Sequence, residues 1–389
     1  MSNSAIHTIN IEGYNSDGEG VARLEDGRVV FVRGAARDDV LEIKLTSEQP
    51  RSTRAEIVHI QKPSPHRIQP DCALYPECGG CDYRHITYEE ELKAKLQCVN
   101  DALQRIGGLT LQVNEILHTG QINGYRNKVV LHSDGSSIGL YRAQSHDVVP
   151  VDSCLLLKDD LNKAIKDLRK SDKEPDKKIT LRSGRNGVNH QPLEEELDGL
   201  IFKVEGFFQV NTEAALLLFQ KARKYAALTK NDTLIDLYCG VGALTLFIGR
   251  DADHALGVEI NTGAVEIARE NAQRNNLSHI EFIQADAADL TAGAADRTVF
   301  ITAPDCVIVD PPRKGLSSGA VRKIIELSPK RLVYISCNPA TLARDLKVLN
   351  ESGYCIKNIC AVDMFPRTAN IECCCLLTPA CQDRDLNPS

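Results

Sequence analysis

The chain has 389 residues, of which 42% are hydrophobic and 25% are charged, and its formal net charge at pH 7 is −7. This composition is that of an ordinary soluble protein, and the length exceeds one compact core, so we expect two or three domains. No apolar run reaches the roughly 18 residues that span a bilayer, and Met1 to Gly13 lacks the order of a signal peptide. We therefore expect a cytoplasmic protein without a membrane partner, and the charge gives no global sign of nucleic-acid binding.

Residues 5 to 60 alternate between apolar and polar side chains, as in "RVVFVRG" and "VLEIKLTS", with turn residues between the segments. This pattern predicts four or five short strands that form a small antiparallel barrel. The next segment, residues 60–70, contains three prolines and is predicted to be a linker.

The chain contains fourteen cysteines. In a reducing compartment such residues serve as metal ligands, catalytic thiols or small buried hydrophobic residues rather than as disulfides. Cys72, Cys78 and Cys81 form a C-x5-C-x2-C array, which is tight enough for three thiolates to reach one centre. Cys154 is the best candidate for a fourth ligand and Cys98 is the second. Four thiolates suit a structural zinc or a [4Fe–4S] cluster, and the spacing does not separate these two.

A helix is predicted from Tyr88 to Ile106, because its residues have helical periodicity and two glycines follow it. Residues 112–206 are mixed and rich in strands, and their charged stretch Lys158 to Lys178 is typical of a solvated helix and loop. After Gly206 short apolar strands alternate with helices, which predicts a mainly parallel sheet covered by helices on both faces.

Five of these later strands end in residues that can carry chemistry. In such α/β sheets ligands bind at the carboxyl ends of the strands. Those positions hold Asp236, Glu259, Asp286, Asp310 and Cys337.

The segment "DLYCGVGALTL" places Gly240 and Gly242 in a turn between a strand and a helix, where the backbone can approach a ligand closely. Glu259 follows about 20 residues later, where a carboxylate can accept both hydroxyls of a ribose. Asp286 can accept a hydrogen bond from an adenine amino group. These acids could instead cap helices, but their order is similar to that of S-adenosylmethionine-dependent methyltransferases. An NAD-dependent enzyme would need a tighter glycine turn than this one.

The segment "IVDPPRKG" places Asp310 before two prolines, as in methyltransferases that act on exocyclic amino groups. Those enzymes need no cysteine, whereas this chain has Cys337 at the next strand end, in "YISCNPATLARD". A thiolate is useful for methylation of uracil C5, because that carbon becomes nucleophilic only after attack on C6. The same scheme needs a base to remove the C5 proton, for which Glu372 is the candidate.

Together, "GFFQVN", "DLYCGVG", "VDPPRKG", "SCNPATLARD" and "MFPRTANIEC" resemble the RNA (uracil-C5)-methyltransferase family from Gly206 to about Cys373. The resemblance implies a Rossmann-like class I methyltransferase domain with S-adenosylmethionine as its cofactor. It implies that Cys337 is the nucleophile and Glu372 the proton acceptor. Phe207 is expected to stack on the target base. The pocket residues that the resemblance implies are Gln209, Tyr238, Glu259 and Asp310.

Three positions depart from this family. Asn370 and Arg367 stand where relatives have histidines, and Ala243 stands where they often have a polar residue. These departures keep open the hypothesis that the chain is an RNA-binding homologue without activity. A second alternative is an amino-group methyltransferase that uses Asp310 alone.

The front half also resembles parts of this family. Bacterial members with the same cysteine array and a distant fourth cysteine bind a [4Fe–4S] cluster, so iron is the preferred metal at Cys72, Cys78, Cys81 and Cys154. The barrel resembles a TRAM domain, an RNA-binding module. Residues 1–68 contain nine Lys and Arg against ten Asp and Glu, so RNA binding there would need a local cluster of the arginines. These arginines are Arg23, Arg28, Arg33, Arg37, Arg51 and Arg54.

The predicted organisation is a TRAM-like barrel at 1–62, a mixed α+β central domain at 63–205, a methyltransferase domain at 206–379 and a tail at 380–389. We expect a monomer that extrudes a uridine from a structured RNA and methylates its C5. A barrel joined to a domain with a cysteine-ligated cluster resembles the arrangement of the ribosomal RNA enzymes. This resemblance implies 23S rRNA as the substrate, with the transfer RNA T-loop as the alternative.

Overall fold

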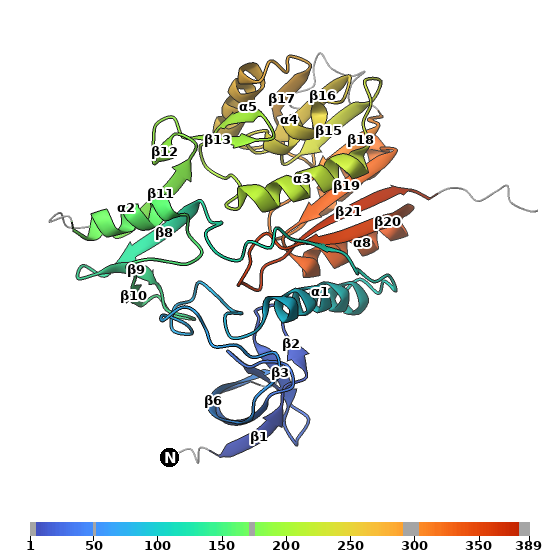
Figure 1. The fold of residues 1–389 in the computed structure, drawn as a ribbon. Coiled ribbons are helices and arrows are strands. Elements are labelled where there is room, and N and C mark those ends of the chain that lie inside the picture. Colours follow the sequence, from blue (N-terminus) through green and yellow to red (C-terminus); the bar gives the residue numbers. More distant parts are fainter. Residues whose placement is uncertain (1–4, 50–51, 171–175, 291–302, 381–389) are drawn as a thin grey trace, which may run out of the picture. The chain divides into compact units, whose positions relative to one another are not determined.

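A computed structural model describes residues 5–49, 52–170, 176–290 and 303–380 (Figure 1). The chain forms two compact units. The first contains the residues up to Cys98, Gly120–Ser183 and Phe365–Asn370, and the second contains Val99–Thr119, Gly184–Met364 and the residues from Ile371. Arg51 and residues 381–389 of the predicted tail lie outside the described residues. Within the described ranges no helix is long and apolar enough to cross a membrane.

The first unit begins with a six-stranded sheet in the order β1-β5-β6-β4-β3-β2. Its strands are β1 (Ile6–Asn10), β2 (Gly13–Tyr14), β3 (Gly20–Arg23), β4 (Val29–Val32), β5 (Val40–Gln49) and β6 (Ser52–Lys62). All neighbouring pairs are antiparallel except β4 and β6, which are parallel. The prediction of a purely antiparallel barrel was wrong at this pair, because side chains alternate with the same period in parallel and antiparallel strands.

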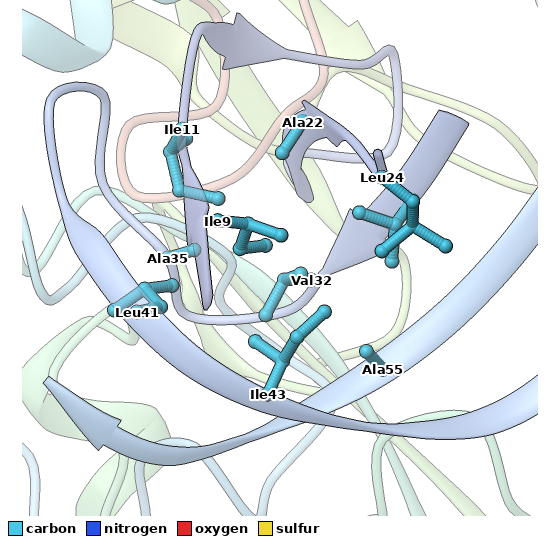
Figure 2. Close-up of a cluster of buried hydrophobic side chains, with 10 residues drawn as sticks. Ile9, Ile11, Ala22, Leu24, Val32, Ala35, Leu41, Ile43 and Ala55 are labelled. Atoms are coloured by element: carbon cyan, nitrogen blue, oxygen red, sulfur yellow. The ribbon is translucent and has the colours of Figure 1, made fainter. Parts of the chain in front are cut away.

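The inner face of this sheet carries the aliphatic residues that the alternation predicted. Figure 2 shows Ile9, Ile11, Val32, Leu41 and Ile43 pointing toward one another from three strands and an adjoining turn. All five side chains are buried. Their burial removes apolar surface from water and provides the main stabilisation of this small module.

The predicted linker at 60–70 is ordered against the barrel. β6 extends into it as far as Lys62. Asp39 is fully buried and accepts hydrogen bonds from the backbone N–H of Ser64 at 2.8 Å and from Arg67 at 2.6 Å. A buried carboxylate needs such donors to offset its desolvation, so this segment forms part of the barrel rather than a free connection.

Helix α1 (Tyr88–Arg105) follows, in agreement with the predicted helix from Tyr88 to Ile106. The central part of the first unit is a sheet in which β8 (Lys128–Ser133), β9 (Ile138–Tyr141), β10 (Val148–Pro150) and β11 (Lys178–Gly184) lie in the order β10-β9-β8-β11. Helix α2 (Asp159–Arg169) lies within the predicted charged stretch and buries Leu161 and Ile165. The short strands β12 (Gly187–Val188), β13 (Glu194–Leu197) and β14 (Leu200–Lys203) come next.

The second unit is built on an eight-stranded sheet in the order β17-β16-β15-β18-β19-β21-β20-β7 (Figure 1). The strands are β7 (Ile116–Leu117), β15 (Thr233–Leu237), β16 (His254–Glu259), β17 (Ile280–Gln284), β18 (Cys306–Val309), β19 (Arg331–Ser336), β20 (Tyr354–Val362) and β21 (Glu372–Pro379). The helices are α3 (Thr212–Ala226), α4 (Ala243–Gly249), α5 (Thr262–Arg274), α7 (Ser318–Leu327) and α8 (Pro339–Glu351).

The strands from β17 to β19 are parallel, as predicted, and β21 is antiparallel to β19 and β20. The chain proceeds outward from β15 to β17 and then returns to the other side of β15 with β18. Sheets of this kind bind ligands outside the carboxyl ends of the strands at the point where the order reverses, here between β15 and β18.

Candidate functional site

The carboxyl ends of the parallel strands form one edge of the sheet, which we call the catalytic rim. Each of the five strands ends at or just before a predicted site residue. Along the rim these residues are Asp286 after β17, Glu259 at the end of β16, Tyr238 after β15, Asp310 after β18 and Cys337 after β19. β21 runs in the opposite direction, so its first residue, Glu372, lies at the same rim.

The turn after β15 has an unusual backbone. Tyr238, Gly240 and Gly242 have φ values of 70°, 55° and 83°, and α4 begins immediately afterwards. The backbone N–H groups of Tyr238 and Cys239 donate to the carbonyl oxygen of Val258 on β16, at 2.9 and 3.0 Å. The turn is therefore fixed against the neighbouring strand and exposes the backbone that a cofactor can approach.

Glu259 is held beside this turn rather than at a helix cap. Its carboxylate accepts hydrogen bonds from the backbone N–H of Gly240 at 3.1 Å and of Asn261 at 2.9 Å. Asn261, not Glu259, caps α5 through the N–H of Ala264. Asp286 accepts from the N–H of Ala288 at 2.8 Å, within its own turn.

Asp236 lies beneath the pocket and is 1% exposed. Its Oδ2 accepts a hydrogen bond from the hydroxyl of Thr245 at 2.6 Å, while its Oδ1 has no hydrogen-bond partner among the described residues. Burial, together with the negative charges of Asp310 and Glu259, raises the pKa of Asp236 to about 7. A buried acceptor without a donor suits a ligand that brings its own hydrogen-bond donor or positive charge.

A pocket opens between this turn and the segment that precedes α3. Its lining residues are Phe207, Phe208, Gln209, Phe219, Asp236, Tyr238, Cys239, Gly240, Val241, Ala243, Leu244 and Asp310. It thus contains the predicted Gln209, Tyr238, Gly240 and Asp310. The sequence reasoning missed the apolar residues of its wall, because Phe219 and Leu244 occupy ordinary helix positions and carry no motif signal. The ring of Phe207 is 75% exposed.

Cys337 and Glu372 are brought together by strand register. Ser336 of β19 pairs with Cys373 of β21, so Cys337 and Glu372 are the next residues outward on the two strands, and the charge of Glu372 acts on Cys337. Cys337 is half-buried, whereas Glu372 is 6% exposed. After the thiol, the chain turns directly into α8, which Asn338 caps through the N–H of Ala340.

The pKa values of Cys337, Asp310 and Glu372 are raised, and the charges of these groups affect one another. Burial raises the pKa of Cys337 to about 11, and the charges of Glu372 and Asp310 add to this effect. Burial raises the pKa of Asp310 to about 7, and burial and the Asp310 charge raise the pKa of Glu372 well above its usual value. Arg313 opposes these shifts, because its positive charge lowers the pKa values of both Cys337 and Glu372. The sequence reasoning did not select Arg313.

The loop that carries Arg313 is attached to the helix that follows Cys337. The carbonyl oxygen of Arg313 accepts hydrogen bonds from Asn338 Nδ2 at 3.1 Å and Thr341 Oγ1 at 3.3 Å. Asp345 of α8 accepts from the N–H of Leu316 at 2.8 Å. The loops after Asp310 and after Cys337 therefore form one hydrogen-bonded assembly.

The four cysteines predicted as metal ligands lie in the first unit. Burial raises the pKa values of Cys78, Cys81 and Cys154, and a negative charge on Cys154 would raise those of Cys78 and Cys81 further, as one on Cys72 would raise those of Cys78 and Cys154. Cys98, the second candidate, instead directs its thiol to the carbonyl oxygen of Asn15 at 3.4 Å. Among the described side chains, no three His, Cys, Asp or Glu are placed to hold a single metal ion.

Arg367, which stands in place of a family histidine, is buried within the first unit. Its backbone N–H donates to Glu91 Oε1 at 2.7 Å, and its guanidinium lies 3.5 Å from Glu91 Oε2. Lys95 completes the cluster, 2.8 Å from Glu91. Arg367 thus holds the loop Phe365–Asn370 to α1. Asn370 Nδ2 donates to Thr368 Oγ1 at 3.3 Å, a local contact of the same loop.

A matched pair of glycine substitutions tests the turn after β15. A Cβ at Gly242 would lie 2.8 Å from the ring of Phe282, whereas a Cβ at Gly240 meets no atom within 4 Å. We expect Gly240→Ala to cost about 1 kcal/mol from its positive φ alone, and Gly242→Ala to cost about 2–4 kcal/mol because a clash is added. Urea unfolding checks both values, and equal costs would contradict the packing of Gly242 against Phe282.

Comparisons with known proteins agree with this arrangement. A family model described as tRNA (Uracil-5-)-methyltransferase matches residues 157–380, and a TRAM domain model matches residues 5–58. An uncharacterised RNA methyltransferase of Bacillus cereus is 32% identical over 94% of this chain and 95% of its own length. One of Gloeobacter violaceus is also 32% identical, over 94% and 95%.

A solved structure extends the likeness to the fold. The tRNA (uracil-54, C5)-methyltransferase of Pyrococcus abyssi, in complex with S-adenosyl-L-homocysteine, matches with a TM-score of 0.73 and 25% identity. The match covers 95% of this chain and 99% of that one. The chain therefore belongs to the tRNA (uracil-5-)-methyltransferase family, as an S-adenosylmethionine-dependent RNA (uracil-C5)-methyltransferase with an amino-terminal TRAM domain.

Proposed function

We propose that the protein methylates C5 of one uridine through a covalent bond between Cys337 and C6 of the base. The observation that supports this proposal is the register of β19 and β21, which brings Cys337 and Glu372 to one edge of the sheet, where both are influenced by Asp310 of the pocket. A thiol acceptor of C6 and a base for the C5 proton are the two groups that the reaction requires. An enzyme acting on an amino group would need neither.

The proposed steps follow from these two groups. The Cys337 thiolate adds to C6, and the electron pair of the C5–C6 double bond moves into the ring and makes C5 nucleophilic. Bound S-adenosylmethionine supplies the methyl group that C5 acquires. Glu372 then takes the proton from C5, the double bond re-forms, and the thiolate of Cys337 leaves, so that 5-methyluridine is released.

The cofactor site is proposed at the turn after β15. Glu259, held by the N–H groups of Gly240 and Asn261, would bind the ribose hydroxyls, and Asp286 would receive the adenine amino group. Gln209 and Tyr238 line the pocket beside this turn, and so does Asp236, whose Oδ1 has no hydrogen-bond partner among the described residues.

The target uridine has to leave its stack to reach this site. Phe207 is exposed at the pocket and is proposed to stack on the extruded ring. The departure at Ala243 leaves an apolar residue in the pocket wall at the start of α4, so no polar contact to the cofactor is proposed there.

We propose 23S rRNA in the cytoplasm as the substrate, because a TRAM domain followed by the cysteine array of Cys72, Cys78, Cys81 and Cys154 resembles the arrangement of the ribosomal RNA enzymes. The alternative is a transfer RNA T-loop, which is favoured by the likeness to the Pyrococcus abyssi enzyme. We also propose that the protein acts as a monomer organised in three domains, with limits at residues 62, 205 and 379.

Mapping of 5-methyluridine tests these proposals. RNA is prepared from a strain that lacks the gene and from the same strain after complementation, and nucleoside mass spectrometry is applied to purified 23S rRNA and transfer RNA. A 5-methyluridine that returns only in 23S rRNA supports the first substrate, and one that returns only in transfer RNA supports the alternative. An unchanged content in both would contradict the proposed function.

We further propose that Cys72, Cys78, Cys81 and Cys154 hold a [4Fe–4S] cluster. Cys81 Sγ accepts a hydrogen bond from Arg84 Nε at 3.3 Å, and Cys78 Sγ accepts one from the N–H of Gly80 at 3.4 Å. Such donors are typical of cluster ligands. Burial raises the pKa of Cys81 to about 12, so that a bound metal centre would supply the charge that makes this thiol a thiolate.

A pair of cysteine variants tests the cluster. After anaerobic purification, Cys81→Ser is expected to lose at least half of the bound iron and acid-labile sulfide, because one ligand is removed, whereas Cys98→Ser keeps both. Metal analysis and the visible absorption spectrum measure the result. Zinc in place of iron, or equal loss in both variants, would overturn the assignment.

A further inference from the structure

The sheet of β8, β9, β10 and β11 has two different faces. Val129, Leu131 and Leu181 alternate on one face and are buried. Ser183 belongs to that face, and its hydroxyl donates to Asp160 of α2, which identifies α2 as the cover (Figure 1). The opposite face carries the intervening residues of the same strands, and no helix of the described first unit is shown to cover it.

This second face is basic. Register places His132 opposite Lys178 and Lys128 opposite Arg182 on β8 and β11, and Arg182, the last of these four, is buried. The four strands, KVVLHS, IGLY, VVP and KITLRSG, contain no acidic residue, although the whole chain has a net charge of −7. Nearby acids are Asp134 in the β8–β9 turn, which accepts from Ser136 and Ser137, Asp147, which faces Arg142, and the exposed Asp176, two residues before β11. The strands of this sheet therefore carry local positive charge, although the net charge of the whole chain is negative.

The same face also carries aromatic rings. His132 of β8 and Tyr141 of β9 are stacked with their ring centroids 3.7 Å apart and an interplanar angle of 17°. His146 lies edge-on to Tyr141 with 5.0 Å between the centroids. Burial, Lys178 and His146 lower the pKa of His132, so its ring is mainly uncharged at neutral pH. Lys178 and His146 are exposed beside this pair.

We propose that this face, defined by Lys128, His132, Tyr141, His146 and Lys178, binds an unpaired RNA strand that flanks the target uridine. Proteins hold single-stranded RNA by stacking bases on aromatic rings and by pairing phosphates with Lys and Arg, and the face offers both at neighbouring positions. A folded acidic protein would use the positive charges but would leave the stacked rings without a matching group. The inference rests on the RNA (uracil-C5)-methyltransferase activity and adds a place for the RNA outside the catalytic rim.

Three substitutions test this face. Lys178→Glu reverses an exposed charge, Tyr141→Ala removes one ring of the stack, and Lys166→Glu on α2 is the matched control for charge. Binding of a fluorescein-labelled oligouridylate is measured by fluorescence anisotropy over a range of salt concentrations. We expect Kd to rise about tenfold for Lys178→Glu, with a salt slope smaller by about 0.7, and at least about fivefold for Tyr141→Ala. Lys166→Glu is expected to stay within about twofold of the wild type.

Two further readouts separate the possible outcomes. Single-turnover methylation of RNA from the deletion strain should require more RNA in both face variants but reach the wild-type rate at saturation. Ultraviolet crosslinking of 4-thiouridine-containing RNA should label the peptide that contains His132 and Tyr141. Equal RNA affinity of Lys178→Glu and the wild type would overturn the proposed face and leave it to another partner, whereas a wild type that neither binds nor methylates RNA would contradict the proposed function itself.

Discussion

Cys337→Ala is expected to abolish methyl transfer, with a loss of at least about 10³-fold in rate, because it removes the thiol that is proposed to add to C6. The variant should still fold and bind S-adenosylmethionine, since a half-buried thiol is replaced by a smaller side chain. RNA that contains 5-fluorouridine should form a stable adduct with the wild-type protein, because fluorine at C5 cannot leave as a proton does. The adduct, seen as a shifted band in a denaturing gel, should be absent with Cys337→Ala.

Cys373→Ala is the matched control for this experiment. Cys373 pairs with Ser336, the residue before Cys337, and is fully buried. Burial raises the pKa of its thiol well above the usual value, so the thiol stays protonated and uncharged at neutral pH. We expect Cys373→Ala to keep the adduct. Retained methylation by Cys337→Ala would favour the amino-group methyltransferase that uses Asp310, and RNA binding without an adduct in the wild type would favour a homologue without activity.

The reactivity of Cys337 should also depend on pH in a defined direction. Burial and the charges of Glu372 and Asp310 raise the pKa of Cys337 to about 11, so the thiolate fraction grows about tenfold per pH unit below that value. The rate of adduct formation should therefore rise between pH 6.5 and 9. Arg313→Met removes a positive charge that lowers this pKa, and it should slow the reaction at neutral pH and recover part of the rate at higher pH. A flat profile would contradict a protonated thiol as the starting state.

The sequence predicted which residues meet at the catalytic rim, because each of them lies at or just after a strand end. Parallel strands bring their carboxyl ends to one edge, so Asp310 and Cys337 become neighbours as soon as β18 and β19 are adjacent. The position of Glu372 could not be predicted from strand ends, because only the antiparallel register of β21 against β19 brings it to the same rim as the thiol. Alternation in a strand cannot supply that register, and the family resemblance had to do so.

Other features depended on tertiary contacts that no local pattern contains. Arg313 follows two prolines in an ordinary loop, and its influence on Cys337 appears only when that loop is attached to α8. Glu91 and Lys95 lie on α1, and charged residues on a helix usually face the solvent. Both are nevertheless buried together with Arg367. The basic face of β8 and β11 could not be predicted either, because its residues come from distant parts of the chain. Lys128 and Lys178, for example, are 50 positions apart.

Glu372→Gln is expected to stop the reaction after methyl transfer rather than before it. The amide cannot accept the C5 proton, so the thiolate of Cys337 cannot leave and the methylated RNA should remain attached to the protein. Ordinary uridine RNA should then give the covalent adduct that the wild type gives only with 5-fluorouridine. We expect turnover to fall by at least about 10²-fold, the usual scale for loss of a general base. Radioactive methyl groups retained in the protein band of a denaturing gel measure this state.

The loss should not come from unfolding, and the sign of the pKa shift shows why. The pKa of Glu372 is raised in the folded protein by burial and by the charge of Asp310, so the ionised form is disfavoured and stability falls as the pH rises from the unfolded pKa through the folded one. Glutamine carries no charge, so Glu372→Gln should be at least as stable as the wild type at pH 8. Asp310→Asn is the companion variant, since it also removes a buried carboxylate but leaves the base in place, and it should lower methylation without accumulating adduct. Accumulation in Asp310→Asn but not in Glu372→Gln would reverse the roles of the two acids.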